Sequence, residues 1–149
     1  LINPKSPITN QKKYLLPSIK NTWKPQYLFH SIRFILQSMK ALIVEDNAKM
    51  RRMMADFIKH KFEKIYECTD GSQALSLYAK HLPDWVLMDW QMAETDGITA
   101  TREIIAEFPT AKICLVTSYD DALLKSEALE AGAKGFVLKR NLAELLVLF

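Results

Sequence analysis

Five side chains that can do chemistry lie directly after short apolar runs of the 149-residue sequence. They are Glu45, Asp46, Asp89, Thr117 and Lys139. Carboxylates that are crowded together repel one another, which raises their pKa values unless a cation lies close by. Lys139 supplies one positive charge against three negative ones, so a divalent cation would balance the rest. An oxygen-only ligand set suits Mg²⁺, and the lack of His and Cys in it argues against zinc.

A carboxylate beside Mg²⁺, an ammonium group and a hydroxyl can attack a phosphoryl group and form an aspartyl phosphate. Asp89 is the natural acceptor because it follows the third apolar run, which is expected at the centre of a sheet. Glu45 and Asp46 then hold the metal. Two plainer interpretations remain open: the acidic residues form a solvated rim, or Asp46 or Asn47 only caps the next helix.

The elements that must position these side chains are five short apolar runs, each followed by a pattern of helical period. The runs are 41–44, 65–68, 85–88, 113–116 and 136–138, and the last helical pattern covers 142–149. Four of the five runs are unbroken by polar residues, which is typical of parallel strands covered on both faces. The alternation predicts an α/β protein with an open parallel sheet, in which ligands bind at the carboxyl ends of the strands.

The net charge of +3 divides unevenly along the chain. Residues 1–38 hold six Lys or Arg residues and no acidic residue, whereas residues 39–149 hold 14 basic and 17 acidic residues. We therefore expect a basic, proline-containing extension over 1–38, mostly disordered with a short helix at 26–38, and one domain over 39–149. Three interpretations of the extension stay open: the natural protein starts at Met39, the extension is genuine, or its helix docks on a membrane surface or a partner.

Composition also indicates the cellular compartment and the classes of partner to expect. Cys68 and Cys114 each lie in an apolar stretch without metal-ligand spacing, which indicates two reduced thiols and a cytoplasmic protein. No apolar run of about 18 residues is present, so we expect no membrane partner for the domain. Its acidic balance likewise predicts that the domain makes no contact with nucleic acid.

Five segments of the sequence resemble the receiver domain of bacterial two-component response regulators. They are ALIVEDN (41–47), VLMDWQM (86–92), DG (96–97), LVTS (115–118) and AGAKGFVLK (131–139). The likeness extends over essentially all of residues 39–149. Residues 132–146 most resemble receivers of the nitrate-response type, and Asp89-Trp90 resembles the chemotaxis regulator. The family resemblance implies a doubly wound (βα)5 flavodoxin-like fold whose five-stranded parallel sheet has the order 2-1-3-4-5.

The resemblance also implies roles for individual residues. Asp89 is the implied phospho-acceptor, Lys139 the ion-pairing lysine, Thr117 the switch hydroxyl and Phe136 the switch aromatic. The implied ligands of Mg²⁺ are Glu45, Asp46, Asp89 and the backbone carbonyl of Gln91. Arg140 stands where the family often has a cis proline. Because a cis bond before another residue costs about 2.5–4 kcal/mol, we expect the Lys139–Arg140 bond to be trans.

The partners implied by the resemblance are those of a signalling switch rather than of an enzyme with its own substrate. A sensor histidine kinase or a phosphotransfer protein is the implied donor, and the receiver itself catalyses its phosphorylation and its later dephosphorylation. The phosphorylated form is expected to act on a downstream protein target, on an output domain beyond residue 149, or through a phosphorylation-dependent homodimer.

Three alternatives differ from a stand-alone receiver. The chain could be the receiver fragment of a longer DNA-binding transcriptional regulator. An Asp-nucleophile phosphohydrolase of the haloacid dehalogenase type is disfavoured, because its nucleophile follows the first strand and a cap domain is added. A flavin-binding electron carrier is also disfavoured, because Glu45 and Asp46 after the first strand would repel the phosphate of FMN.

Overall fold

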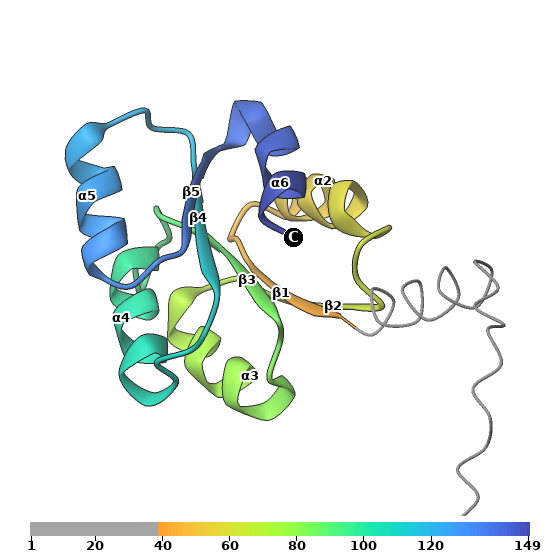
Figure 1. Cartoon of the computed structure of the whole chain (residues 1–149), viewed down its shortest axis with the longest axis horizontal. Helices are drawn as coiled ribbons and strands as arrows, with labels where there is room; N and C mark the ends of the chain where they lie inside the picture. Colours follow the sequence, from red (N-terminus) through yellow and green to blue (C-terminus); the bar gives the residue numbers. More distant parts are fainter. Residues whose placement is uncertain (1–38) are drawn as a thin grey trace, which may run out of the picture.

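The computed structural model describes residues 39–149, which form a parallel sheet covered by helices on both faces (Figure 1). The five strands are β1 (Lys40–Val44), β2 (Lys64–Cys68), β3 (Trp85–Asp89), β4 (Ile113–Thr117) and β5 (Gly135–Leu138). Their order in the sheet is β2-β1-β3-β4-β5, which confirms the predicted order 2-1-3-4-5. The extension predicted over 1–38, with its helix at 26–38, lies outside the described residues.

Helices pack against both faces of the sheet. They are α2 (Ala48–Ile58), α3 (Ala74–His81), α4 (Gly97–Glu107), α5 (Ala122–Glu130) and α6 (Leu145–Leu148). Helices α2 and α6 lie on one face, and α3, α4 and α5 lie on the other (Figure 1). Alternate side chains of each strand enter opposite cores: Leu42 and Val44 of β1 contact one, Ala41 and Ile43 the other. Each fully buried Leu or Ile contributes roughly 1.5–3 kcal/mol to folding.

The apolar character of each strand matches its place in the sheet. Strands β3 and β4, in the interior, are buried along their whole length. Strand β2 lies at an edge, and its polar residue Glu67 is exposed. The one broken apolar run of the sequence is therefore an edge strand.

Three of the helices in residues 39–149, α2, α4 and α5, begin at an Asx side chain. Asn47 caps α2 by accepting hydrogen bonds from the backbone N–H groups of Lys49 and Met50, both at 3.0 Å. Asp96 and Asp121 cap α4 and α5 in the same way. The capping residue of α2 is thus Asn47, and Asp46 remains exposed at the edge of the sheet.

The end of the chain is less regular than its helical pattern indicates. A 3-10 helix covers Lys139–Glu144, and only Leu145–Leu148 is α-helical. Asn141 breaks the helix because its φ of −132° and ψ of 50° are not helical. The Lys139–Arg140 bond is trans, as predicted, since residues 39–149 contain no cis peptide bond.

Two further expectations concern the thiols and the membrane. Cys68 and Cys114 are both buried, and no disulfide joins them. Burial raises the pKa of Cys68 to about 11 and that of Cys114 to about 12. Among the helices of residues 39–149, none combines the length and the apolar character needed to cross a bilayer.

The loop between β3 and α4 is held in place by close backbone contacts. A Cβ atom at Gly97 would lie 2.0 Å from the carbonyl oxygen of Asp89, and one at Gly71 would lie 2.4 Å from that of Thr95. The carboxylate of Asp70 accepts the backbone N–H of Ser72 at 2.7 Å and that of Glu94 at 3.1 Å. The loop that follows Asp89 is therefore fixed both by packing and by hydrogen bonds.

We expect Gly97→Ala to lower the free energy of unfolding by roughly 2 kcal/mol or more, because the new methyl group overlaps the backbone of Asp89. Helix propensity alone predicts that the same substitution raises the free energy of unfolding, because alanine forms helices better than glycine. Gly135→Ala is the matched control, since a Cβ there meets side-chain atoms only, the end of Leu148 at 2.8 Å and Sγ of Cys114 at 3.1 Å. Urea unfolding of both variants measures the difference, and an equal loss in both would contradict the backbone explanation.

Hydrogen bonding by the backbone N–H of Ser72, opposed by burial, lowers the pKa of Asp70 below its ordinary value of 3.8. A lowered pKa in the folded state stabilises the protein above the ordinary pKa, and this contribution is lost as the pH falls through the folded value. We expect Asp70→Asn to be least stable relative to wild type near neutral pH. The gap should shrink as the pH falls below 3.8 and through the lower pKa of the folded state. Urea unfolding at several pH values measures the gap, and a constant gap would disprove this explanation.

Candidate functional site

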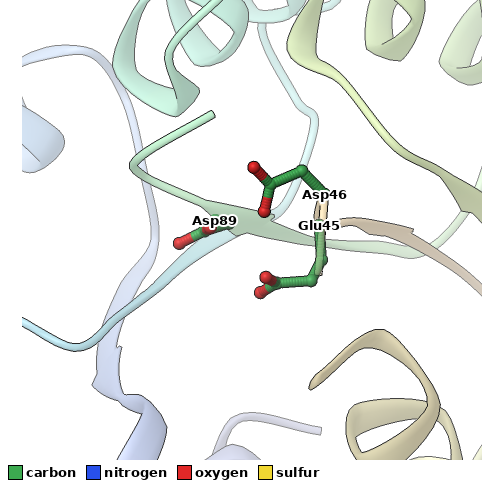
Figure 2. A group of neighbouring side chains, drawn as sticks. All are labelled: Glu45, Asp46 and Asp89. Carbon is green, nitrogen blue, oxygen red and sulfur yellow. The ribbon is translucent and has the colours of Figure 1, made fainter. Parts of the chain in front are cut away.

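The predicted site residues come together at the carboxyl edge of the sheet. Glu45 and Asp46 follow β1, and Asp89 is the last residue of the neighbouring strand β3. Figure 2 shows the three side chains gathered at these two strand ends, with their carboxylates extending to the same side. One oxygen from each carboxylate lies within 4.8 Å of the others. The sheet order therefore builds the acidic cluster, because adjacent parallel strands end side by side.

Lys139 lies immediately after β5 and reaches across to two of the three carboxylates. Its Nζ is 2.8 Å from Oε2 of Glu45 and 2.9 Å from Oδ1 of Asp89. All three side chains are buried or nearly so, with 14% of Lys139, 5% of Asp89 and none of Glu45 exposed. An ion pair at this depth is screened little by water or salt.

Burial and charge act in opposite directions on these groups. Burial raises the pKa of Glu45, and the contact with Lys139 offsets only part of this effect. Burial likewise raises the pKa of Asp89, while Lys139 and the backbone N–H of Gln91 lower it. Burial would lower the pKa of Lys139, but its contacts with Glu45 and Asp89 outweigh that and raise it. The site therefore holds more negative charge than one lysine can compensate.

The donor set of the cluster fits a hard divalent cation. Within residues 39–149, Oε2 of Glu45 is the one buried side-chain oxygen or nitrogen without a hydrogen bond of good geometry. It forms an ion pair with Nζ of Lys139 at 2.8 Å. Three carboxylates against one ammonium leave two negative charges uncompensated when all are ionised. Glu45 and Asp89 are buried, whereas Asp46 is exposed to solvent, so water can also reach the cluster. This arrangement matches the preference of Mg²⁺ for a few carboxylates and several waters.

The two predicted switch residues lie on the last two strands of the sheet, Thr117 on β4 next to β3 and Phe136 on the edge strand β5. Thr117 ends β4, is 1% exposed, and its Oγ1 accepts the backbone N–H of Tyr119 at 3.2 Å. Phe136, on β5, is half-buried and packs against a small cluster formed by Ile98, Leu124 and Ala131. Phe136 therefore packs against helix α5, whereas Thr117 lies at the carboxyl edge of the sheet, where β4 ends.

Some contacts around the site are not evident from sequence patterns. The hydroxyl of Tyr119 donates to Oε1 of Gln91 at 3.0 Å, and the ring of Tyr119 meets the edge of Trp90. Arg51 of α2 contacts the backbone that follows β1. Each contact joins residues whose types are common on protein surfaces, and only the fold brings them together.

Comparison with known proteins gives the same picture. The sequence model of the protein family described as response regulator receiver domain matches residues 41–148. The chemotaxis protein CheY of Bacillus subtilis is 41% identical over 101 residues, which are 67% of this chain and 84% of CheY. The transcriptional regulatory protein DegU of Brevibacillus brevis is 31% identical over 113 residues, which are 73% of this chain and 47% of DegU.

Solved structures agree with these relatives. A LuxR-family two-component response regulator from Aurantimonas superposes with a TM-score of 0.70 at 31% identity, over 74% of this chain and 81% of that one. CheY in a complex with CheX, BeF3 and Mg²⁺ from Borrelia burgdorferi superposes with a TM-score of 0.67 at 27% identity, over 74% and 86%. This chain therefore belongs to the response regulator receiver domain family.

Proposed function

We propose that this receiver takes a phosphoryl group onto Asp89 in a Mg²⁺-dependent reaction and changes conformation as a result. The observation that carries the proposal is the convergence of Glu45, Asp46 and Asp89 at one edge of the sheet, with Lys139 bridging two of them. A relative of known structure contains BeF3 and Mg²⁺, which supports the same chemistry here.

The reaction needs few groups from the chain. An oxygen of the Asp89 carboxylate attacks phosphorus, an O–P bond forms, and the bond from phosphorus to the leaving group of the donor breaks. The ammonium of Lys139, now 2.9 Å from that carboxylate, stays close enough to compensate charge on the transferred group. Bound Mg²⁺ would supply further charge compensation, and the groups that would hold it are the carboxylates of Glu45, Asp46 and Asp89 and the backbone carbonyl of Gln91.

Hydrolysis of the aspartyl phosphate ends the signal and restores the carboxylate of Asp89. A water molecule attacks the phosphorus of the aspartyl phosphate, the O–P bond to Asp89 breaks, and inorganic phosphate leaves. The chain therefore acts as a switch that catalyses its own phosphorylation and dephosphorylation. We propose a sensor histidine kinase or a phosphotransfer protein as the donor, and the cytoplasm as the place of action.

The conformational response runs through Thr117 and Phe136. The hydroxyl of Thr117 moves to hydrogen-bond the phosphoryl group, and Phe136 repacks against the cluster beneath α5. The altered surface then acts on a downstream protein, on an output domain, or through a homodimer. The match to less than half of DegU supports a second candidate, a receiver that forms part of a longer regulator.

Acetyl phosphate with Mg²⁺ should add one phosphoryl group to the wild-type chain and none to Asp89→Ala, as measured by intact mass. Asp120→Ala is the matched control, because Asp120 is an exposed carboxylate at the rim that pairs with Arg140. The control should be labelled like wild type. Equal labelling of the wild-type and Asp89→Ala chains would refute Asp89 as the acceptor.

Thr117→Val should still bind beryllofluoride at Asp89 but should not transmit the change to Phe136, because the methyl group cannot donate a hydrogen bond. Nuclear magnetic resonance of labelled phenylalanine measures this as a shift of the Phe136 signals in wild type and little shift in the variant. Thr110→Val is the control, since Thr110 is exposed before β4 at the opposite edge of the sheet. A full Phe136 shift in Thr117→Val would remove Thr117 from the switch.

A further inference from the structure

Arg51 joins three parts of the structure beside the acidic cluster. It lies in the first turn of α2, and its guanidinium is largely buried, with 17% of the side chain exposed. Its Nη1 donates to the carbonyl oxygen of Glu45 at 2.8 Å and lies 3.5 Å from that of Asp46. Its Nε donates to Oε2 of Glu67 on β2 at 2.9 Å. One side chain thus ties β2, α2 and the backbone after β1.

These contacts restrain the two peptide groups that flank Asp46, the preceding one more firmly because its hydrogen bond is shorter. The carbonyl of Glu45 belongs to the planar peptide before the Cα of Asp46, and the carbonyl of Asp46 belongs to the one after it. Holding both planes restricts φ and ψ of Asp46 and therefore the direction of its Cα–Cβ bond. Among residues 39–149, no side chain or backbone N–H hydrogen-bonds or ion-pairs with the carboxylate of Asp46. Its direction therefore depends on the backbone.

We propose that Arg51 is a positioning residue for the Mg²⁺ site, acting through the backbone of Glu45 and Asp46. The inference rests on the proposed Mg²⁺-dependent function and adds a residue outside the ligand set. Groups that orient metal ligands without touching the metal commonly change metal affinity by 10–100-fold when they are removed.

The charge of Arg51 provides a sharp test, because charge and geometry predict opposite signs. A positive side chain close to a cation site repels the cation, so removing the charge strengthens Mg²⁺ binding if electrostatics alone matters. Removing the side chain weakens Mg²⁺ binding if Arg51 positions Asp46. The direction of the change therefore identifies the role.

A lysine cannot replace Arg51 in this arrangement. The guanidinium uses Nε for Glu67 and Nη1 for the carbonyl groups, and these nitrogens are held in one rigid plane. The ammonium of a lysine is a single point donor at the end of a flexible chain. Arg51→Lys therefore keeps the charge and most of the apolar stem but loses the geometry.

Isothermal titration of the full chain with MgCl2 tests the proposal. We expect Arg51→Met to bind Mg²⁺ roughly tenfold more weakly than wild type, and Arg51→Lys to be weakened several-fold. Arg52→Met is the matched control: Arg52 is the next residue of α2, is exposed, and loses the same charge. This control should bind Mg²⁺ as tightly as wild type or slightly more tightly.

Two further outcomes separate the positioning role from the function itself. Mg²⁺ binding by Arg51→Met and Arg51→Lys that equals or exceeds that of Arg52→Met would overturn the positioning role. Asp46→Asn tests the site: if it binds Mg²⁺ like wild type, the proposed metal site itself is wrong. Urea unfolding without metal checks that each variant is folded, and if Arg51→Met does not fold, Arg51→Lys alone decides the matter.

Discussion

The contact of one ammonium group with two buried carboxylates is the interaction on which the site depends. Glu45 and Asp89 come from the ends of two central strands and are withdrawn from water, so each would favour its neutral form without a cation nearby. A neutral Asp89 is a poor nucleophile and a poor metal ligand. Lys139 opposes the effect of burial on the pKa of both groups and so favours their ionised forms. It does so from beyond β5, an edge strand two positions away from β3.

This dependence explains why the whole sheet is needed for a site made of so few residues. Lys139 reaches Glu45 only if β5 pairs with β4 in the observed register, in which Thr117 lies opposite Leu138. Breaking a buried ion pair by removing one partner costs about 3–5 kcal/mol. An error in the register of β5 would therefore leave the buried Glu45, which follows β1, without its cation. Arg140, which follows Lys139, pairs with Asp120 at 2.6 Å and adds a weak, exposed link between the β5 and β4 loops.

Much of this arrangement could be predicted from sequence, because topology decides it. Alternating strands and helices indicate a parallel sheet. Parallel strands place the residues that follow them at one edge, and this rule alone predicts that Asp89 and Lys139 belong to the site. Arg51 could not be found in this way: it and Arg52 are adjacent and alike in sequence, and only the packing of α2 directs one of them toward the β1 loop. The role of Asp70 in holding the loop after Asp89 is not evident from sequence, because one of its two partners, the backbone N–H of Glu94, lies 24 residues away.

The close approach at Gly97 has a mechanical consequence. The first residue of α4 packs backbone against backbone on the carbonyl of Asp89, with no side chain between them that could deform. A soft contact would absorb a displacement of a few tenths of an ångström, whereas a contact of this kind transmits it. Asp89 and α4 therefore form a stiff joint, and any strain that a new substituent places on Asp89 is passed to the helix.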